Sequence, residues 1–155
     1  MNKYFTENTM LGEMTAVEEN GKLLQLSFGK PSTDVSAKME KTFIIEQTFN
    51  QLEEYFSGKR KTFSIPLVLK GTDFQMKVYK ALCGIMYGET ISYKQLAEKI
   101  GNPKACRAVG NANNKNPIAI IIPCHRVIGS NGDLVGYAGG VQIKQKLLEI
   151  EKNVV

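Results

Sequence analysis

The chain has 155 residues, of which 43% are hydrophobic and 23% charged, and this composition excludes an intrinsically disordered protein. The longest uninterrupted apolar run, Ile118–Pro123, is too short to span a membrane, and residues 1–14 lack the apolar core of a secretory signal. The three cysteines form no CxxC pair, and their odd number argues against a disulfide framework. We therefore expect a cytoplasmic protein with no membrane partner.

Charge is distributed unevenly along the chain. Residues 1–66 carry eight Lys or Arg and nine Asp or Glu, whereas residues 67–155 carry twelve and six, a net charge of +6. Within the second part, residues 94–126 hold six basic residues and one acid. Such a basic half fits a polyanionic partner, but an ordinary solvated basic face explains it equally well.

The first predicted domain, residues 1–66, reads as a small sheet with one helix. Residues 11–28 predict two strands, because the pair Asn20-Gly21 between them is typical of a tight hairpin turn. Residues 42–57 predict a helix, since their apolar side chains recur at helical spacing and Gly58 follows as a stop signal.

The second predicted domain, residues 67–155, reads as mostly helical. The segments 72–75 and 92–95 each have the form of a capping box, the pattern that opens many helices. The first of these helices is expected to run as far as Gly88, and the second is expected to end at Gly101.

A third helix is predicted over residues 103–113, with Asn102 as its cap and Pro103 in the first turn. Together with the helix before it, this segment forms a candidate helix-turn-helix. Its predicted inner side holds Ala105, Val109 and Ala112, and its outer side holds Arg107, Gly110, Asn111 and Asn114. The small, polar outer side could approach another surface closely, although a solvated face would look the same.

The residues that could carry chemistry follow the apolar run 118–122, which predicts a buried strand or extended segment. Cys124 comes directly after it and is followed by His125, the only histidine. A thiolate is a strong nucleophile, and an imidazole can accept the thiol proton near neutral pH. Because sequence neighbours do not face each other in regular structure, a bridging water is the easier proton relay. A buried cysteine beside a structural histidine is the alternative, and the pair alone favours it.

Glu151 lies on the last predicted helix, 141–152, among apolar residues. A carboxylate on an apolar face is costly without a partner, so Glu151 could orient His125 as the third member of a triad. The alternative is that Glu151 frays into water. Cys83 and Cys106 are expected to be packing residues. One histidine and scattered cysteines make no zinc site, and no nucleotide-binding motif is present, so neither metal nor cofactor is predicted.

These motifs resemble the O6-alkylguanine-DNA alkyltransferase family, also called methylated-DNA–protein-cysteine methyltransferases. The segment Pro123–Ile128 is similar to the active-site motif of that family. Further segments match in order and at family spacing: 71–74, 91–93, 101–105, 107–110, 116–117 and 137–140. The resemblance covers about residues 67–151, whereas the N-terminal half matches only in size and coarse pattern.

The resemblance implies an α+β fold, in which a small RNase H-like domain of sheet plus helix precedes a winged helix-turn-helix domain. It also implies DNA repair by a monomer that binds the minor groove of double-stranded DNA and flips the damaged base into a pocket. The alkyl group of O6-alkylguanine, or of O4-alkylthymine, would pass irreversibly to Cys124.

The resemblance also assigns roles to individual residues. His125 would act as a base through a water, Glu151 would orient it, and Tyr93 would protonate a guanine ring nitrogen. Arg107 would fill the space of the flipped base. The other residues expected at the DNA are Lys104, Ala108, Gly110 and Asn111. The residues expected around the substrate pocket are Asn116, Val127, Tyr137 and Ala138, with Ala138 where many relatives carry Ser.

Two rival functions remain open at this point. The chain could recognise alkylated DNA or regulate transcription without catalysis, as a helix-turn-helix binding protein, or it could be a cysteine hydrolase. Cys124 argues against the first rival, because a non-enzymatic branch of the family replaces this cysteine. Some relatives bind zinc in the N-terminal domain, but residues 1–66 contain no Cys or His, which again predicts no metal.

Overall fold

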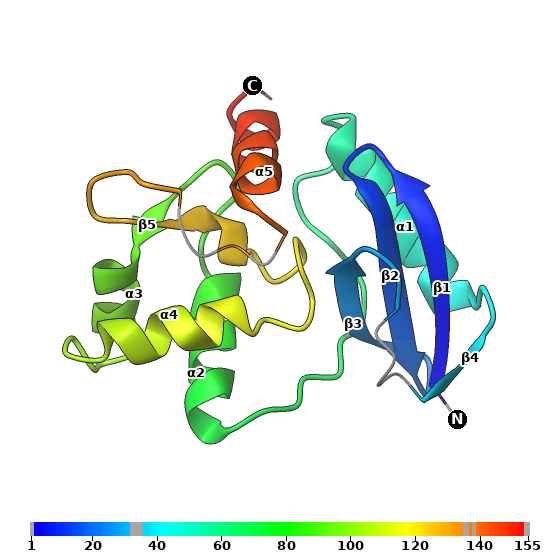
Figure 1. Ribbon diagram of the computed structural model, residues 1–155, viewed down its shortest axis with the longest axis horizontal. Coiled ribbons are helices and arrows are strands. Elements are labelled where there is room, and N and C mark those ends of the chain that lie inside the picture. The colour runs from blue at the N-terminus through cyan, green and yellow to red at the C-terminus, as the bar shows by residue number, and fades with distance from the viewer. Residues whose placement is uncertain (1, 32–35, 135–136, 138, 154–155) are drawn as a thin grey trace. The chain divides into compact units, whose positions relative to one another are not determined.

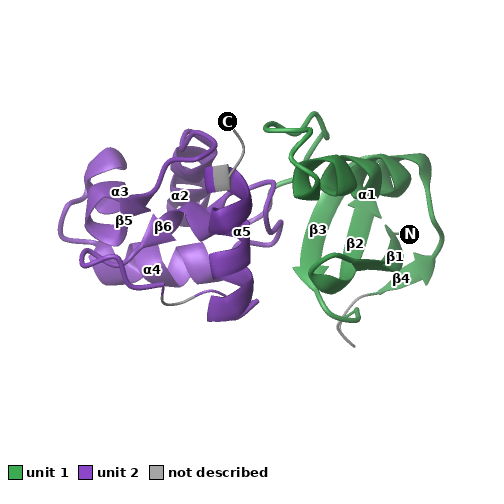
Figure 2. Ribbon diagram, turned by 90° about the horizontal axis from the view of Figure 1, so that it is seen from above, with its two compact units in different colours: residues 1–69 green, residues 70–155 purple. Residues whose placement is uncertain are grey.

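The computed structural model describes residues 2–31, 36–134, 137 and 139–153. The chain divides into two compact units, residues 1–69 and 70–155 (Figure 2). Sequence patterns put the boundary after Pro66. The first unit contains a sheet and a helix and the second is mostly helical, so the predicted α+β class is confirmed.

Four strands form the sheet of the first unit, in the order β3-β2-β1-β4. They are β1 (Asn2–Thr9), β2 (Gly12–Glu19), β3 (Lys22–Phe28) and β4 (Ala37–Met39). β2 pairs antiparallel with β1 and β3, and β4 runs parallel to β1. The predicted hairpin turn is confirmed, because Asn20 and Gly21 both adopt positive φ angles, 52° and 81°. β1 and β4 were not predicted.

Helix α1 (Phe43–Phe56) covers one face of this sheet (Figure 1). It begins as predicted, with Thr42 as the cap that accepts a hydrogen bond from the backbone N–H of Ile45. It ends before Gly58, whose φ of 79° suits a glycine after a helix. The side chains of Ile45 and Leu52 are buried on its inner side and hold the helix against the sheet.

In the second unit, both capping boxes open helices as predicted. Thr72 and Gln75 cap α2 (Asp73–Cys83), and Ser92 and Gln95 cap α3 (Tyr93–Lys99). α2 ends earlier than predicted, however. Gly84 is its C-cap, and the backbone N–H of Ile85 bonds to Leu82 O, so the chain leaves the helix in a tight turn well before Gly88.

Helix α4 (Cys106–Asn114) contacts α3, and the two form the helix-turn-helix. α4 begins three residues later than predicted, because residues 103–104 lie in a turn and Ala105 is the cap. The cap position has no side-chain hydrogen bond, unlike those of α2 and α3. Cys106 and Cys83 are exposed at helix ends, so the prediction that they are packing residues was wrong.

The predicted strand at 118–122 was also wrong. The segment is buried, but its backbone turns, with Ile121 N–H bonded to Ala119 O and Ile122 N–H to Ile118 O. Ile120 adopts a φ of 71°, which for a β-branched residue stores about 1–3 kcal/mol of strain. The chain therefore enters the Cys124 region through a strained, closely packed loop rather than a strand.

A 3₁₀ helix, two short strands and the last helix complete the described part of the second unit. A 3₁₀ helix, Cys124–Arg126, leads into β6 (Val127–Ile128), which pairs in parallel with β5 (Ile91–Ser92). The last helix, α5 (Val141–Asn153), matches the prediction and contacts the 3₁₀ helix. No helix in the described parts of the chain is long and apolar enough to cross a membrane.

Candidate active site

Cys124 is the first residue of the 3₁₀ helix, and its side chain is buried, with 6% of its surface exposed. Its Sγ accepts a hydrogen bond of 3.0 Å from Asn116 Nδ2. The same Nδ2 donates to Ile122 O at 2.8 Å, and Asn116 Oδ1 accepts from the N–H of Ile118 at 3.0 Å. Asn116 therefore fixes both the loop before Cys124 and the direction of its thiol.

The thiol of Cys124 is held in its protonated form. Burial raises its pKa above the usual value of 9, while the hydrogen bond from Asn116 and the charge of Lys144 lower it only in part. Because the nucleophile in cysteine chemistry is the thiolate, this sulfur needs a base that takes its proton when reaction occurs.

His125 supplies a neutral imidazole next to that thiol. Its ring is completely buried, and burial lowers its pKa below 6.5 although Glu151 opposes this effect; the charges of Arg126 and Lys144 lower it further. His125 Nε2 lies 2.6 Å from Glu151 Oε2. His125 Nδ1 has no hydrogen-bond partner among the described residues.

Glu151 determines which ring nitrogen of His125 carries the proton. Its carboxylate accepts hydrogen bonds from Arg126 Nε at 2.8 Å, Arg126 Nη2 at 3.0 Å and the N–H of Gly88 at 3.2 Å. Both oxygens therefore act as acceptors, so Nε2 of the neutral imidazole donates to Glu151 and Nδ1 keeps the lone pair. With 4% of its surface exposed, Glu151 does not fray into water.

Arg126, the cation that follows His125 in the sequence, is part of this network, a role that no sequence pattern indicated. It binds Glu151 with two nitrogens, donates from Nη1 to Ile85 O at 2.6 Å and lies 5.7 Å from the ring centre of Tyr87. The turn that ends α2 early is what places the carbonyl of Ile85 within reach. Arg126 thus fixes Glu151 to the turn that follows α2.

Lys144 was also missed. Its side chain on α5 is fully buried, its Nζ donates to Val127 O at 2.5 Å, and it lies 5.9 Å from the ring centre of Tyr93. Burial lowers its pKa from 10.5 to about 8. A helical spacing of seven residues puts Lys144 on the same face as Glu151, so the argument that identified Glu151 could have identified Lys144 too.

Tyr93 is the first residue of α3, so the cap at Ser92 fixes the position of its backbone. Its ring lies over α4 at Gly110, where an added Cβ would come within 3.8 Å of the ring. Burial raises the pKa of Tyr93 above 10, the negative charge of a Cys124 thiolate raises it further, and a side-chain hydrogen bond with Asn113 lowers it. The phenol is therefore a proton donor, not an anion, at neutral pH.

Comparison with known proteins identifies the family. Residues 73–153 match the model of the 6-O-methylguanine DNA methyltransferase DNA binding domain, and residues 2–69 match that of its ribonuclease-like domain. The chain belongs to the 6-O-methylguanine DNA methyltransferase family. The resemblance noted from the motifs is thereby confirmed, and the match includes the N-terminal half, which showed no motif.

Relatives in this methyltransferase family are similar over most of their length. The methylated-DNA--protein-cysteine methyltransferase of Methanosarcina barkeri is 53% identical over 88% of this chain and 87% of its own. The constitutive enzyme of that name from Bacillus subtilis is 46% identical over 98% and 96%. The crystal structure of Mycobacterium tuberculosis OGT in complex with DNA is 43% identical, covers 99% of this chain and 94% of its own, and superposes with a TM-score of 0.92.

The residues expected at the DNA lie on α4 of this methyltransferase fold or in the turn before it. Lys104, Arg107, Ala108 and Asn111 are exposed, and Gly110 is half-buried against Tyr93. Among the expected pocket residues, Val127 and Tyr137 are buried beside the thiol network. Ala138 falls outside the described residues.

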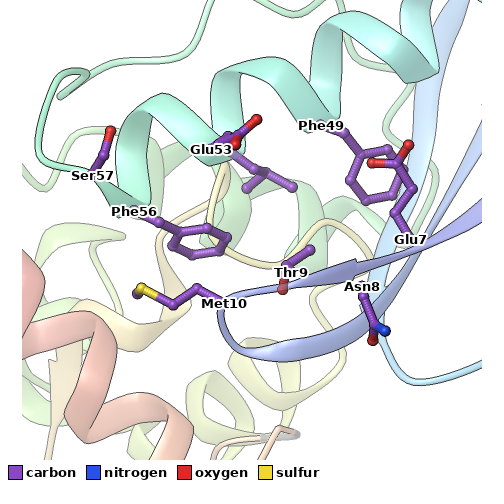
Figure 3. Close-up of a pocket in the computed structure, with 9 residues that line it drawn as sticks. Glu7, Asn8, Thr9, Met10, Phe49, Glu53, Phe56 and Ser57 are labelled. Carbon is purple, nitrogen blue, oxygen red and sulfur yellow. The ribbon is translucent and has the colours of Figure 1, made fainter.

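A separate cavity of about 320 Å³ lies in the first unit, between α1 and the turn from β1 to β2. Figure 3 shows Phe56 of α1 over Met10 of that turn, with Glu53 and Phe49 further along the helix. The lining contains no cysteine, histidine, lysine or arginine. It therefore offers no thiol, imidazole or cation, the groups that the second unit brings together around Cys124.

Proposed function

We propose that this chain repairs DNA by transferring the alkyl group of O6-alkylguanine irreversibly to Sγ of Cys124. The observation that carries the proposal is the buried thiol of Cys124 beside the neutral imidazole of His125, whose other nitrogen is held by Glu151. Relatives named methylated-DNA--protein-cysteine methyltransferase, at 53% and 46% identity, support it. A non-catalytic binding protein of this family would carry another residue in place of Cys124.

The proton and electron movements follow from the tautomer of His125. The thiol proton passes through a bridging water to His125 Nδ1, the nitrogen with the lone pair. The sulfur then attacks the alkyl carbon, an S–C bond forms, the C–O6 bond breaks, and its electron pair leaves with the guanine. Tyr93 donates its phenolic proton to ring nitrogen N3, so the guanine does not depart as a free anion. One thioether and one repaired guanine result.

The DNA side of the proposal rests on α4. Its exposed face carries one large cation, Arg107, among small residues, and a face of this kind can enter a minor groove about 6 Å wide with little widening. Arg107 would fill the gap left when the damaged base is flipped out of the stack. O4-alkylthymine would be a second substrate, and the protein would act as a monomer.

Mass spectrometry after mixing with duplex DNA that contains O6-methylguanine tests the proposal directly. We expect a gain of one methyl group per chain, on the peptide that contains Cys124. Cys124→Ser should abolish transfer and still bind DNA, because an alcohol is a far poorer nucleophile at neutral pH. Cys106→Ser, at an exposed thiol, is the matched control and should transfer normally.

Each rival function predicts a different result in the same assay. A cysteine hydrolase would release many products per chain and keep its thiol free. A recognition protein would bind the damaged duplex and gain no mass. Transfer at the wild-type rate by Cys124→Ser would show that another residue is the acceptor.

A further inference from the structure

The outer edge of β1 is only partly covered by β4. β4 pairs with the first part of β1, and the N–H of Glu40, just after β4, bonds to Tyr4 O at 3.0 Å. Backbone groups of alternate residues in a strand point to the same side, so those of Thr6 and Asn8 point away from β2, as those of Tyr4 do. They have no backbone partner among the described residues. Such an edge is a template for another strand.

The cavity between α1 and the turn from β1 to β2 lies along the same part of β1. Residues 7–10 line it from the sheet side, and Phe49, Leu52 and Phe56 line it from α1. Met10, at its end, leaves 60% of its surface exposed. A strand added to the free edge of β1 would therefore find an apolar cavity beneath the side chains that it turns toward α1.

The charges at this cavity favour a basic partner. Its lining holds two acids, Glu7 and Glu53, and no Lys, Arg or His. Glu7 is paired with Lys41, whereas Glu53 is exposed and forms no ion pair with a described residue. An unpaired carboxylate in such a lining repels the phosphates of a nucleic acid and attracts the side chain of a Lys or Arg.

The spacing on α1 matches the spacing along a strand. Glu53 and Phe56 are three residues apart on α1, so they project from the same side of the helix, about 5–6 Å from each other. Alternate side chains on one face of a strand are about 6.5–7 Å apart. A strand with a basic and an apolar residue at alternate positions could place the cation at Glu53 and the apolar side chain between Phe56 and Met10 (Figure 3).

We propose that the free edge of β1 and this cavity form a binding site for an extended segment of another protein, with basic and apolar side chains at alternate positions. The segment would bond to the backbone of Thr6 and Asn8, a common way for a sheet to take up a peptide. A second copy of the chain fits poorly, because pairing β1 with β1 would bring two Glu7 carboxylates together. The site lies wholly in the first unit, so it does not depend on the proposed alkyl transfer.

NMR titration of the isotope-labelled, intact protein with the capped peptide Thr-Lys-Thr-Leu-Thr-Lys-Thr tests the site. Leu stands between two Lys, so one Lys can reach Glu53 in either strand direction. We expect saturable shifts around the cavity and slower hydrogen exchange at the amides of Thr6 and Asn8. The amide of Glu7, which faces β2, should change little and is the internal control.

Charge reversal tests the choice of partner. Glu53→Lys should weaken binding of the lysine peptide about fivefold, the upper range for an exposed ion pair. The same peptide with Glu in place of each Lys should bind this variant more tightly than it binds the wild type. Glu54→Lys, at an exposed residue outside the lining, is the matched control and should keep the wild-type affinity to within about twofold.

Three results would overturn the proposal. The first is the absence of saturable shifts with the lysine peptide, and the second is binding that leaves exchange at Thr6 and Asn8 unchanged. The third is equal affinity of the wild type and Glu53→Lys for that peptide. Protection of the two amides that grows with protein concentration, without peptide, would show instead that a second copy occupies the edge. Glu53 is exposed, and the spectrum of each variant reports directly whether it is folded.

Discussion

At the scale of single residues, Glu151 connects His125, the proposed general base, to the rest of the second unit. Its two oxygens receive hydrogen bonds from His125, Arg126 and the backbone of Gly88. Such a carboxylate fixes the tautomer and orientation of an imidazole, as partners of catalytic histidines commonly do. In the proposed reaction its effect would therefore pass through His125 and would not involve the DNA surface.

Glu151→Gln should slow alkyl transfer roughly 10- to 100-fold, because the amide no longer offers His125 and Arg126 two charged oxygens. Binding to undamaged duplex should change little. The thiol pKa of Cys124, followed by the absorbance of the thiolate, should rise further above its usual range. Glu149→Gln, at the exposed carboxylate on α5, is the matched control. An unchanged rate and an unchanged thiol pKa would show that Glu151 has only a structural role.

Lys144 gives the folded protein a distinctive pH dependence. Its pKa is about 8 in the folded state and 10.5 when the side chain is in water. Between these values the unfolded chain keeps a proton that the folded chain has released, so this group makes the protein more stable as pH rises from 8 to 10.5. The gain over that range is at most about 3 kcal/mol.

Urea unfolding at several pH values between 7.5 and 10.5, with wild type and Lys144→Met, measures this effect. The cysteine and tyrosines with raised pKa values titrate in the opposite sense in both proteins, so the difference between the two curves reports Lys144 together with its effect on Cys124. The wild type should gain stability relative to the variant as pH rises. Parallel curves would mean that the ammonium group is well solvated.

At the scale of elements, α4 bears Arg107, the residue on which the proposed base extrusion depends. Arg107 is the second residue of this short helix, and its side chain is exposed. If it fills the stack in place of the flipped base, Arg107→Ala loses the compensation for unstacking, worth a few kcal/mol. Repair within a duplex should therefore be severely impaired, while reaction with the free base O6-benzylguanine should be nearly normal.

The experiment compares the rates of Arg107→Ala on duplex DNA and on O6-benzylguanine. Lys104→Ala, at a neighbouring exposed cation, is the control. The lysine variant should weaken DNA binding, but with saturating duplex it should leave the ratio of duplex to free-base rates unchanged. Equal losses on both substrates in Arg107→Ala would place the arginine in the pocket or in folding rather than in base extrusion.

The elements that sequence patterns predicted correctly are those with local signals. The capping boxes at Thr72 and Ser92 and the turn at Asn20-Gly21 each satisfy their backbone groups within four residues, so tertiary contacts need not be known. The apolar run 118–122 carries no such signal. Its burial was predicted, but its turns depend on Asn116, which binds the loop from outside the run.

At the scale of the whole molecule, the uneven distribution of charge predicts how DNA binding depends on the salt concentration. Residues 67–155 carry the net charge of +6. The logarithm of the binding constant should fall linearly with that of the salt concentration, with a slope near −0.9 for each phosphate neutralised. Lys104→Ala should make the slope shallower by roughly one, and Lys59→Ala, in the first unit, should not. Salt-independent binding would contradict a phosphate contact by this helix-turn-helix.

A residue of the candidate site could be predicted where its role shows in the local sequence pattern. His125 was apparent because it adjoins Cys124, and Glu151 because a carboxylate interrupts an apolar helix face. The hydrogen bonds of Arg126 could not be predicted, since its partners are Glu151 and a carbonyl in a turn that only the early end of α2 creates.

The packing around the sulfur of Cys124 has a consequence for the protein after its single reaction. The sulfur is almost completely enclosed and accepts a hydrogen bond from Asn116. A thioether is a poorer acceptor, and the added methyl must displace neighbours in a strained loop, which typically costs about 1–3 kcal/mol. The reacted chain should therefore melt at a lower temperature than the unreacted one in a thermal scan. Each repair would leave a chain marked by reduced stability, and proteases that act on unfolded protein could remove spent molecules and spare fresh ones.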